Sequence, residues 1–433
     1  MEHLKYYFLN KLLLFVIVFV GTVSFAQEDT SYKKRVLEAT EIELLFSYYG
    51  QDGQNAAVTG GEGTEELTDA TSSIVVKIPL NEDDVLTVDA GISAYTSASS
   101  SNVNPLDGDA SRTVSPFSAS SGASRQDVLT YFNPSYQHTS NDRNSIVNAK
   151  AYVSAEYDYF SLGFGGGYAH LFNEKNTEVS VNVQAFLDKW NSQYPIELRN
   201  GFFDSRTSGT GTYAPDFTAF EKETRNSYSI SLGLSQVLGK KLQGSVFLDL
   251  VSQTGLLSTP FQRIYFADSP DFFIEDFQLA DDVERLPDSR FKVPIGGRLN
   301  YYLNDRVVLR SYYRFYADNW GITSHTANLE VPIKLNDSFT VYPSYRYYSQ
   351  TAADYFYPKK IALSTLDFYT SDYDLSGYTA NQYGIGIRYK DIFAKAKVLT
   401  FGLKNINLRF NAYDRSDGLN ALIMTLGTTF VGD

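Results

Sequence analysis

The feature that most constrains this chain is an alternation of apolar and polar side chains with a period of two residues, sustained over long segments. In segment 227–235 the even positions carry Tyr, Ile or Leu and the odd positions carry Ser or Gly; segments 86–95 and 178–187 alternate in the same way. A helix would need apolar residues three and four positions apart, whereas a period of two gives a strand with one apolar and one polar face. At about ten residues, these strands are long for a soluble sheet and suit a tilted strand that crosses a membrane.

About sixteen such segments follow one another, and an even number is typical of bacterial outer-membrane barrels. They lie near residues 40–50, 71–80, 85–97, 127–138, 145–156, 160–171, 177–188, 227–237, 242–254, 291–303, 307–317, 322–335, 339–350, 382–391, 404–413 and 420–430. The sequence therefore predicts an all-β fold, an antiparallel transmembrane β-barrel of the outer membrane with about 16 strands.

The connections between these segments alternate in length. One set is short and rich in Asn, Asp, Gly and Ser, as turns require. The other set is mostly long and comprises residues 51–70, 98–126, 189–226, 255–290 and 351–381, with short tips near Tyr157, Trp320 and Ser416. Short periplasmic turns and mostly long extracellular loops are the outer-membrane pattern.

The N-terminus has the order of features expected of an export signal. Lys5 and Lys11 precede the apolar run 12–20, and Ser24-Phe25-Ala26 supplies small residues for cleavage. We expect a signal peptide over residues 1–26, a periplasmic N-terminal tail over 27–39 and the barrel over 40–433. The tail is too short for the plug of an energised siderophore-type transporter.

Composition excludes several classes of function. The 433 residues contain no cysteine, which excludes disulfide scaffolds, iron–sulfur clusters and thiol catalysis. The formal charge of −13 argues against nucleic acid as a partner, and a mean hydropathy of −0.25 argues against a bundle of membrane-spanning helices. No zinc-protease, serine-hydrolase or phosphate-loop motif occurs, so we expect no enzymatic activity and no cofactor.

One loop has a weak resemblance to a calcium site. Asp372, Asp374 and Ser376 stand two residues apart before a glycine, which resembles the first half of a calcium loop. The glutamate that should close a twelve-residue loop is replaced by Tyr383. A Ca²⁺ ion in this extracellular loop and a simple solvated turn both remain open.

The polar faces of the strands carry charge of different sign in the two halves of the chain. The predicted acidic wall of the lumen comprises Glu43, Asp89, Glu156, Glu178 and Asp249. The predicted basic wall comprises Lys292, Arg298, Arg310, Arg314, Lys334, Arg346, Arg388 and Arg409. Walls of opposite sign set up a transverse field across a water-filled bore, which favours polar solutes.

Several motifs resemble a known family. They are Tyr49-Gly50-Gln51-Asp52-Gly53 and residues 57–61, 65–70, 94–105, 120–124 and 172–176. The family is a domain-of-unknown-function group of Gram-negative envelope proteins, best represented in Bacteroidota-type genomes. The resemblance implies an outer-membrane barrel without a known activity. It also implies gene neighbours that encode a small lipoprotein and thioredoxin-like and flavin-transferring proteins, hence a possible lipoprotein or envelope redox partner.

Two functions from different classes follow. The first is a porin-like channel for small polar solutes, integral to the outer membrane and in contact with its lipid and lipopolysaccharide. The alternative is a non-conducting structural or interaction protein whose aromatic, acidic extracellular loops bind a partner or a glycan. The rings expected to be exposed for that role are Phe261, Tyr265, Phe266, Phe272, Phe273, Tyr355, Phe356 and Tyr357. The alternative, left open by the sequence, is that the same rings fold into the mouth of the barrel and line it.

Overall fold

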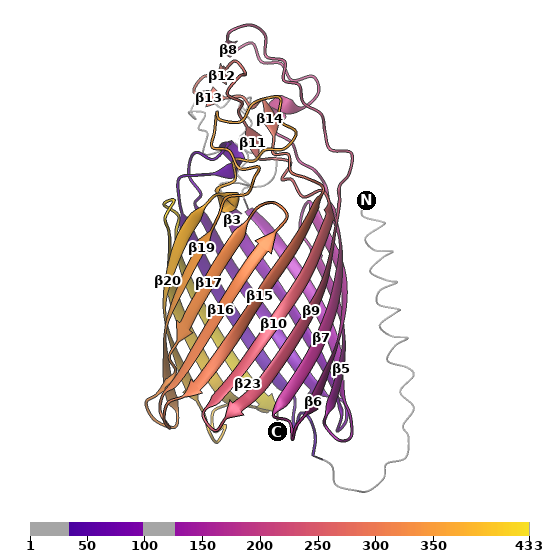
Figure 1. Ribbon diagram of the computed structural model, residues 1–433, viewed down its shortest axis with the longest axis vertical. Coiled ribbons are helices and arrows are strands. Elements are labelled where there is room, and N and C mark those ends of the chain that lie inside the picture. Colours follow the sequence, from indigo (N-terminus) through magenta and orange to yellow (C-terminus); the bar gives the residue numbers. More distant parts are fainter. Residues whose placement is uncertain (1–33, 98–125, 433) are drawn as a thin grey trace. The chain divides into compact units, whose positions relative to one another are not determined.

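The computed structural model describes residues 34–97 and 126–432, and the chain from Val36 onward forms one unit (Figure 1). The predicted signal peptide, residues 1–26, and most of the predicted tail lie outside the described residues. Among the described residues, no helix is both long enough and apolar enough to cross a membrane.

One sheet of eighteen strands makes up the barrel, and two of its strands, β18 (Ile333–Lys334) and β21 (Lys397–Val398), have two residues each. The sixteen long strands are β1 (Glu41–Asp52), β2 (Leu67–Pro79), β3 (Asp84–Ser97), β4 (Gln126–Thr139), β5 (Ser145–Ala155), β6 (Tyr159–Phe172), β7 (Thr177–Trp190), β9 (Thr224–Gly239), β10 (Leu242–Gly255), β15 (Ser289–Tyr302), β16 (Val308–Asp318), β17 (Thr323–Glu330), β19 (Phe339–Gln350), β20 (Tyr378–Lys390), β22 (Phe401–Arg415) and β23 (Asn420–Gly432).

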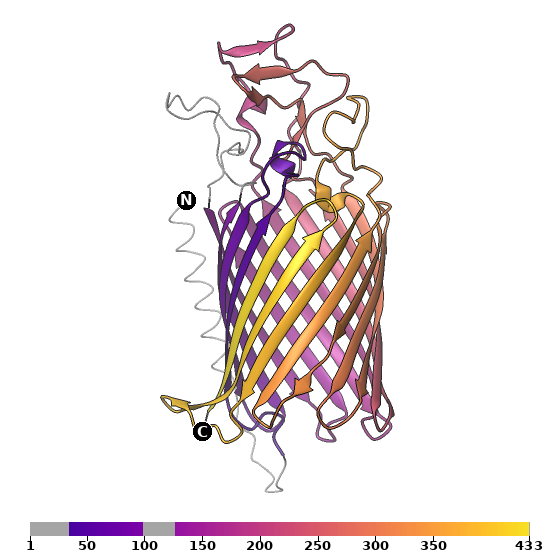
Figure 2. The ribbon, with the colours of Figure 1, turned by 90° about the vertical axis from the view of Figure 1, so that its left-hand side faces the viewer.

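The sheet is antiparallel throughout and closes on itself. Each long strand pairs with its sequence neighbours, and β1 also pairs with β23, from Glu41↔Val431 to Asp52↔Asn420. The strands are tilted around the barrel (Figure 2). The prediction of a sixteen-stranded antiparallel barrel of the outer-membrane kind is therefore confirmed.

One predicted strand is interrupted. Segment 322–335 divides into β17 and β18 on either side of Val331-Pro332. Proline has no N–H to donate to a neighbouring strand, so the ladder stops and resumes after it.

Three of the short turns at one end of the barrel are stabilised by an asparagine side chain in the same way. The side-chain oxygen of Asn81 accepts hydrogen bonds from the backbone N–H groups of Asp83 and Asp84, at 2.8 and 2.9 Å. Asn304 and Asn336 accept two backbone N–H groups each in the same way. Asparagine at this position satisfies backbone donors that the reversing chain leaves unpaired. We call this the turn end of the barrel and the opposite end the loop end.

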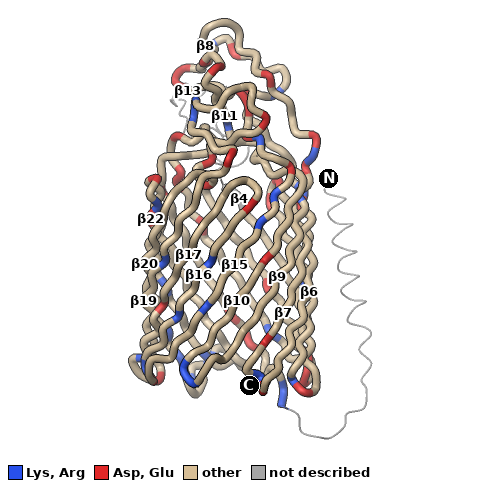
Figure 3. Tube along the Cα trace, in the orientation of Figure 1, with Lys and Arg blue, Asp and Glu red and all other residues tan. Residues whose placement is uncertain are grey.

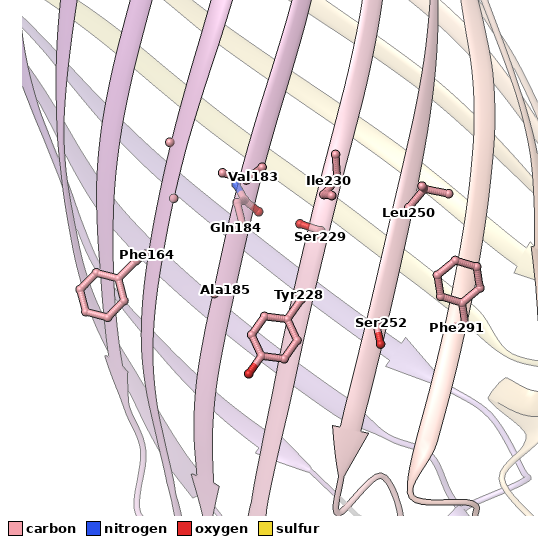
Figure 4. A pocket seen from close by; sticks show the side chains of 12 residues that line it. Phe164, Val183, Gln184, Ala185, Tyr228, Ser229, Ile230, Leu250, Ser252 and Phe291 are labelled. Atoms are coloured by element: carbon pink, nitrogen blue, oxygen red, sulfur yellow. The ribbon is translucent and has the colours of Figure 1, made fainter.

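The outward face of the strands is apolar. In β9 the outward side chains Tyr228, Ile230, Leu232 and Leu234 are 42–47% exposed. Outward side chains of β6, β7, β9, β10 and β15 also line a shallow groove of about 640 Å³, including Phe164 (Figure 4). A continuous apolar surface of this kind is unfavourable in water and suits contact with lipid.

The long loops fold together into a compact layer at the loop end, which we call the cap. It comprises residues 53–66, 191–223, 256–288 and 351–377 and contains β8 (Thr207–Gly209), β11 (Arg263–Ile264), β12 (Phe272–Ile274), β13 (Phe277–Gln278), β14 (Asp282–Val283) and the 3-10 turns η1 (Ala57–Thr59), η4 (Ile196–Leu198) and η5 (Tyr373–Leu375).

The cap has its own hydrophobic core, made of three clusters of buried side chains. They centre on Phe272, Ile274, Phe277 and Leu279; on Leu198, Tyr265, Ala280 and Val283; and on Ile264, Phe266, Ala362 and Tyr369. The expectation that the loop rings are exposed is wrong for Tyr265, Phe266 and Phe272, which are 3%, 5% and 6% exposed. The other five of those rings are half-buried. The three buried rings pack into the core of the cap instead of offering a surface to a partner.

A fully buried ion pair joins three segments of the cap. Arg263 and Glu197 are both inaccessible to solvent, with Nε donating to Oε1 at 2.6 Å. Arg263 also donates from Nη1 to the carbonyl of Val58 and lies over the ring of Phe277, 5.2 Å from its centroid. Two hydrogen bonds join the guanidinium to the two carboxylate oxygens, so each buried charge compensates the other.

Replacing one outward apolar side chain with a charged one tests whether the outer face contacts lipid. Leu232→Arg places a charge near the middle of β9 and is expected to cost about 2–4 kcal/mol on folding into lipid. The measurement is the fraction of protein that folds into lipid vesicles, read from gel mobility. Ser231→Arg, one residue away on the inward face, serves as the control and should fold normally; equal folding of the two variants would contradict the assigned faces.

Removing one member of the buried pair tests the cap. Arg263→Met leaves Glu197 buried without its cation and should destabilise the cap by about 3–5 kcal/mol. Limited proteolysis between residues 256 and 288 should then be much faster than in the unaltered protein. The control is Arg206→Met, which breaks a pair with Asp204 that solvent reaches and should change little. Unchanged proteolysis of Arg263→Met would show that the pair does not hold the cap.

Candidate functional site: the arginine wall of the lumen

Six inward-facing arginines lie along one arc of the barrel, and we call them the arginine wall. They are Arg298 on β15, Arg310 and Arg314 on β16, Arg346 on β19, Arg388 on β20 and Arg409 on β22. The pairing register places their side chains on the face opposite the apolar one. Figure 3 shows Lys and Arg positions along these strands and many Asp and Glu positions in the cap.

Two of these arginines share one carboxylate. Arg310 donates to Oε1 of Glu330 at 2.9 Å, and Arg409 donates to Oε2 of the same side chain at 2.7 Å. Two positive charges and one negative charge leave this group with a net positive charge.

One glycine on β20 makes room for the side chain of Arg409. A Cβ atom at Gly386 would lie 2.9 Å from Cγ of Arg409, so a larger residue there would displace the side chain. Arg388 and Arg409 both lie over the buried ring of Tyr342, at 5.3 and 5.1 Å from its centroid. Arg388 also donates to the side-chain oxygen of Asn407. The ring and the amide orient the guanidinium group of Arg388 without neutralising it.

Arg298 is held by rings alone. Its guanidinium lies 5.8 Å from the centroid of Phe247 and 5.6 Å from that of Tyr312, and the two rings stack 5.9 Å apart. Within the described residues, no carboxylate forms an ion pair with Arg298, Arg314, Arg346 or Arg388.

A cavity of about 580 Å³ lies between the wall and the cap, and we call it the sub-cap cavity. Arg314, Arg346, Tyr348 and Tyr413 line it from the strands. Glu65 and Asp374 line it from the cap, and Arg415 at the loop end of β22 joins the two parts by donating to Asp374 at 2.5 Å.

The remaining predicted basic residues lie nearer the two ends of the barrel. Lys292 is near the loop end, opposite Asp318, whose carboxylate is bound by Arg290 at 2.5 Å. Lys334 is at the turn end and pairs with Asp337 at 2.7 Å, so its charge is compensated locally.

The predicted acidic residues are not gathered into one group. Glu43 pairs with Lys77 at 2.9 Å. Asp89, Glu178 and Asp249 lie on the inward face of β3, β7 and β10, and Glu156 follows the last residue of β5. The strands place these carboxylates around the arc that faces the arginine wall.

The weak calcium motif is used for local structure. Asp372 accepts the backbone N–H of Asp374 as the N-cap of η5, Asp374 pairs with Arg415, and the Ser376 hydroxyl donates to the carbonyl of Tyr373. Over residues 34–97 and 126–432, no three Asp, Glu or His side chains cluster in a way that could hold a metal ion.

Sequence reasoning missed the aromatic and hydroxyl partners of the arginines. Tyr342 and Tyr348 occupy even positions of β19, as Arg346 does, so the same period of two could have assigned them to the lumen. Arg415 was missed because its role depends on Asp374, which approaches from a loop without periodicity.

A buried carboxyl group joins two segments of the cap. Glu284 is 2% exposed and accepts hydrogen bonds from the backbone N–H of Thr259 at 2.6 Å and from the hydroxyl of Thr370 at 2.5 Å. Burial, with a contribution from the negative charge of Asp372, raises the pKa of Glu284 to about 8. Ionising this group inside the cap is therefore unfavourable.

The raised pKa makes cap stability depend on pH. The folded cap keeps its proton on Glu284 at pH values at which the unfolded segment has lost it, so stability falls as pH rises from the ordinary glutamate pKa towards about 8. Hydrogen-exchange protection of residues 256–288 should decrease over this range. Glu284→Gln stays neutral and should lose the contribution of Glu284 over this whole range. An identical decrease in the variant would assign the pH dependence to other groups.

Comparison with solved structures shows similarity to outer-membrane proteins. A bacterial polysaccharide outer-membrane secretin has 11% identity and a TM-score of 0.44, with 92% of this chain and 100% of that chain covered. A BenF-like porin from Pseudomonas fluorescens Pf-5 has 9% identity and a TM-score of 0.39, with 91% and 99% covered. OccK1 (OpdK) of Pseudomonas aeruginosa has 8% identity and a TM-score of 0.39, with 90% and 97% covered.

No curated protein matches the chain. Residues 11–425 match the family model described as "Protein of unknown function (DUF3570)", which confirms the family of unknown function expected from the sequence motifs. Since the match spans nearly the whole chain, the protein belongs to the DUF3570 family.

Proposed function

We propose that this protein is an outer-membrane channel for small polar solutes, and that the arginine wall favours anions among them. A barrel of sixteen strands is wide enough to enclose an aqueous channel. The apolar outward face, exemplified by Leu232, supports a position within lipid, with lipopolysaccharide as the proposed neighbour at the loop end. No catalytic role is proposed for the arginine wall.

The observation that carries the proposal is the lack of carboxylate partners for four wall arginines among the described residues. Charged side chains that close the interior of a barrel are usually paired, because burying an isolated charge costs free energy of desolvation. Arg298 and Arg388 are instead held by rings and an amide, so that their charge remains available. Such a surface attracts anions and lowers the barrier to their passage.

A second candidate function is a closed barrel that serves as an anchor or a scaffold. The observation in its favour is the cap, which has a buried core and is tied to the barrel rim by Arg415. Deleting residues 257–287 and joining the ends of β10 and β15 with a short turn separates the two candidates. A channel conducts with its cap in place, and an anchor conducts only after the deletion.

Conductance in planar bilayers under a KCl gradient tests the channel. The intact protein should show discrete steps and a reversal potential of the sign expected for chloride preference. Arg298→Gln combined with Arg388→Gln should move the reversal potential towards zero, because these residues supply uncompensated charge to the lumen. Arg306→Gln, in a turn outside the lumen, is the matched control and should leave it unchanged. An intact protein without conductance, or one that prefers potassium, would overturn the proposal.

A further inference from the structure

Two polar groups on neighbouring strands are buried and lack a partner among the residues described, and the first of them belongs to a residue that lines the sub-cap cavity. They are Nε of Arg314 and the hydroxyl of Thr326. Thr326 is 2% exposed and lies on β17, where the register places it directly between Arg314 on β16 and Tyr348 on β19. A buried donor without an acceptor is costly, and folded proteins rarely keep two side by side. Their position indicates that an acceptor from outside the chain completes the site.

A second cation faces the same space. Arg346 lines the cavity. In the strand register it lies opposite Asn328, which is two residues along β17 from Thr326. Arg314 and Arg346 stand on the two strands that flank β17, about 10 Å apart across the sheet. Two side chains of this length can therefore converge on one anion.

The acidic residues around the cavity do not cancel these charges. Asp374 is paired with Arg415 at 2.5 Å. The carboxylate of Glu65 accepts the backbone N–H of Asn55 on the cap side of the cavity. The cavity thus carries a surplus of positive charge on the wall side.

The rest of the lining is aromatic. Tyr348 and Tyr378 lie with their ring centroids 5.6 Å apart, and Tyr49 and Tyr413 also line the cavity. Flat rings favour contact with a planar apolar group, whereas a fully hydrated inorganic anion would gain nothing from them.

We propose that the sub-cap cavity binds a small organic carboxylate with a planar apolar body. The carboxylate accepts hydrogen bonds from Arg314 and Thr326 and is attracted by Arg346, and the planar body lies against the tyrosine rings. The two oxygens of a carboxylate match the spacing of the N–H donors of a guanidinium group. The site deepens the proposed function, on which it rests, because the ligand reaches the cavity through the lumen.

Calorimetry on the full-length protein in detergent, with benzoate as the probe, tests the site. Benzoate should bind saturably, and benzyl alcohol, which has the same ring without the charge, should not. Arg314→Gln combined with Arg346→Gln should weaken benzoate binding by more than about tenfold. Thr326→Val, which keeps the side-chain shape, should weaken it several-fold. Arg306→Gln combined with Lys240→Gln removes two charges from turns and should leave binding unchanged.

The outcomes separate this site from the channel. An anion-selective conductance without saturable benzoate binding overturns the site and leaves the channel standing. Benzoate binding without conductance supports the site and overturns the channel. If the double arginine variant does not fold, Thr326→Val decides alone, and unchanged affinity in that variant overturns the assignment. Equal binding of benzyl alcohol and benzoate would also overturn it, because charge would then play no part.

Discussion

The constraint on which this structure depends is that the backbone hydrogen bonds must be satisfied within the sheet. An open sheet in lipid would leave a row of unpaired N–H and C=O groups on its edge strands, at several kcal/mol each. Pairing of β1 with β23 removes both edges. In the closed barrel, alternate side chains of each strand point outward and inward. A shift of the strand pairing by one residue would exchange the two sets. The apolar outer face and the arginine wall are two consequences of the same register.

The arginine wall holds several of its guanidinium groups by contacts with aromatic rings rather than by ion pairs. Carboxylates would orient guanidinium groups and cancel their charge, as Glu330 partly does for Arg310 and Arg409. Aromatic rings orient them through cation–π contacts of about 0.5–2 kcal/mol and leave the net charge in place. The narrow residues needed for this packing, such as Gly386, lie on the same strands. Rings and glycines together give a positively charged surface with defined side-chain positions.

The period of two made the barrel predictable, because each strand's face is set by local sequence. It placed nearly all strands and assigned both walls of the lumen by parity. It could not predict the cap, since the partners there are distant in sequence and lie in segments without a period. Arg263 and Glu197 are 66 residues apart, and Tyr265 looks in sequence like any exposed loop ring. Burial of such residues follows from how four loops meet, which depends on the closed barrel that brings their ends together.

The cap and the wall together imply a hydrated lumen. Moving an unpaired guanidinium group from water into a dry interior would cost far more free energy than its contacts with rings provide. In a water-filled lumen that cost is small. Arg346 is exposed within the lumen. The packed core of the cap can thus restrict the loop end, but it cannot exclude water from the wall without destabilising the barrel. In the channel we propose, water that reaches the wall brings dissolved anions with it, so the charges that require hydration are also the charges that attract the solute.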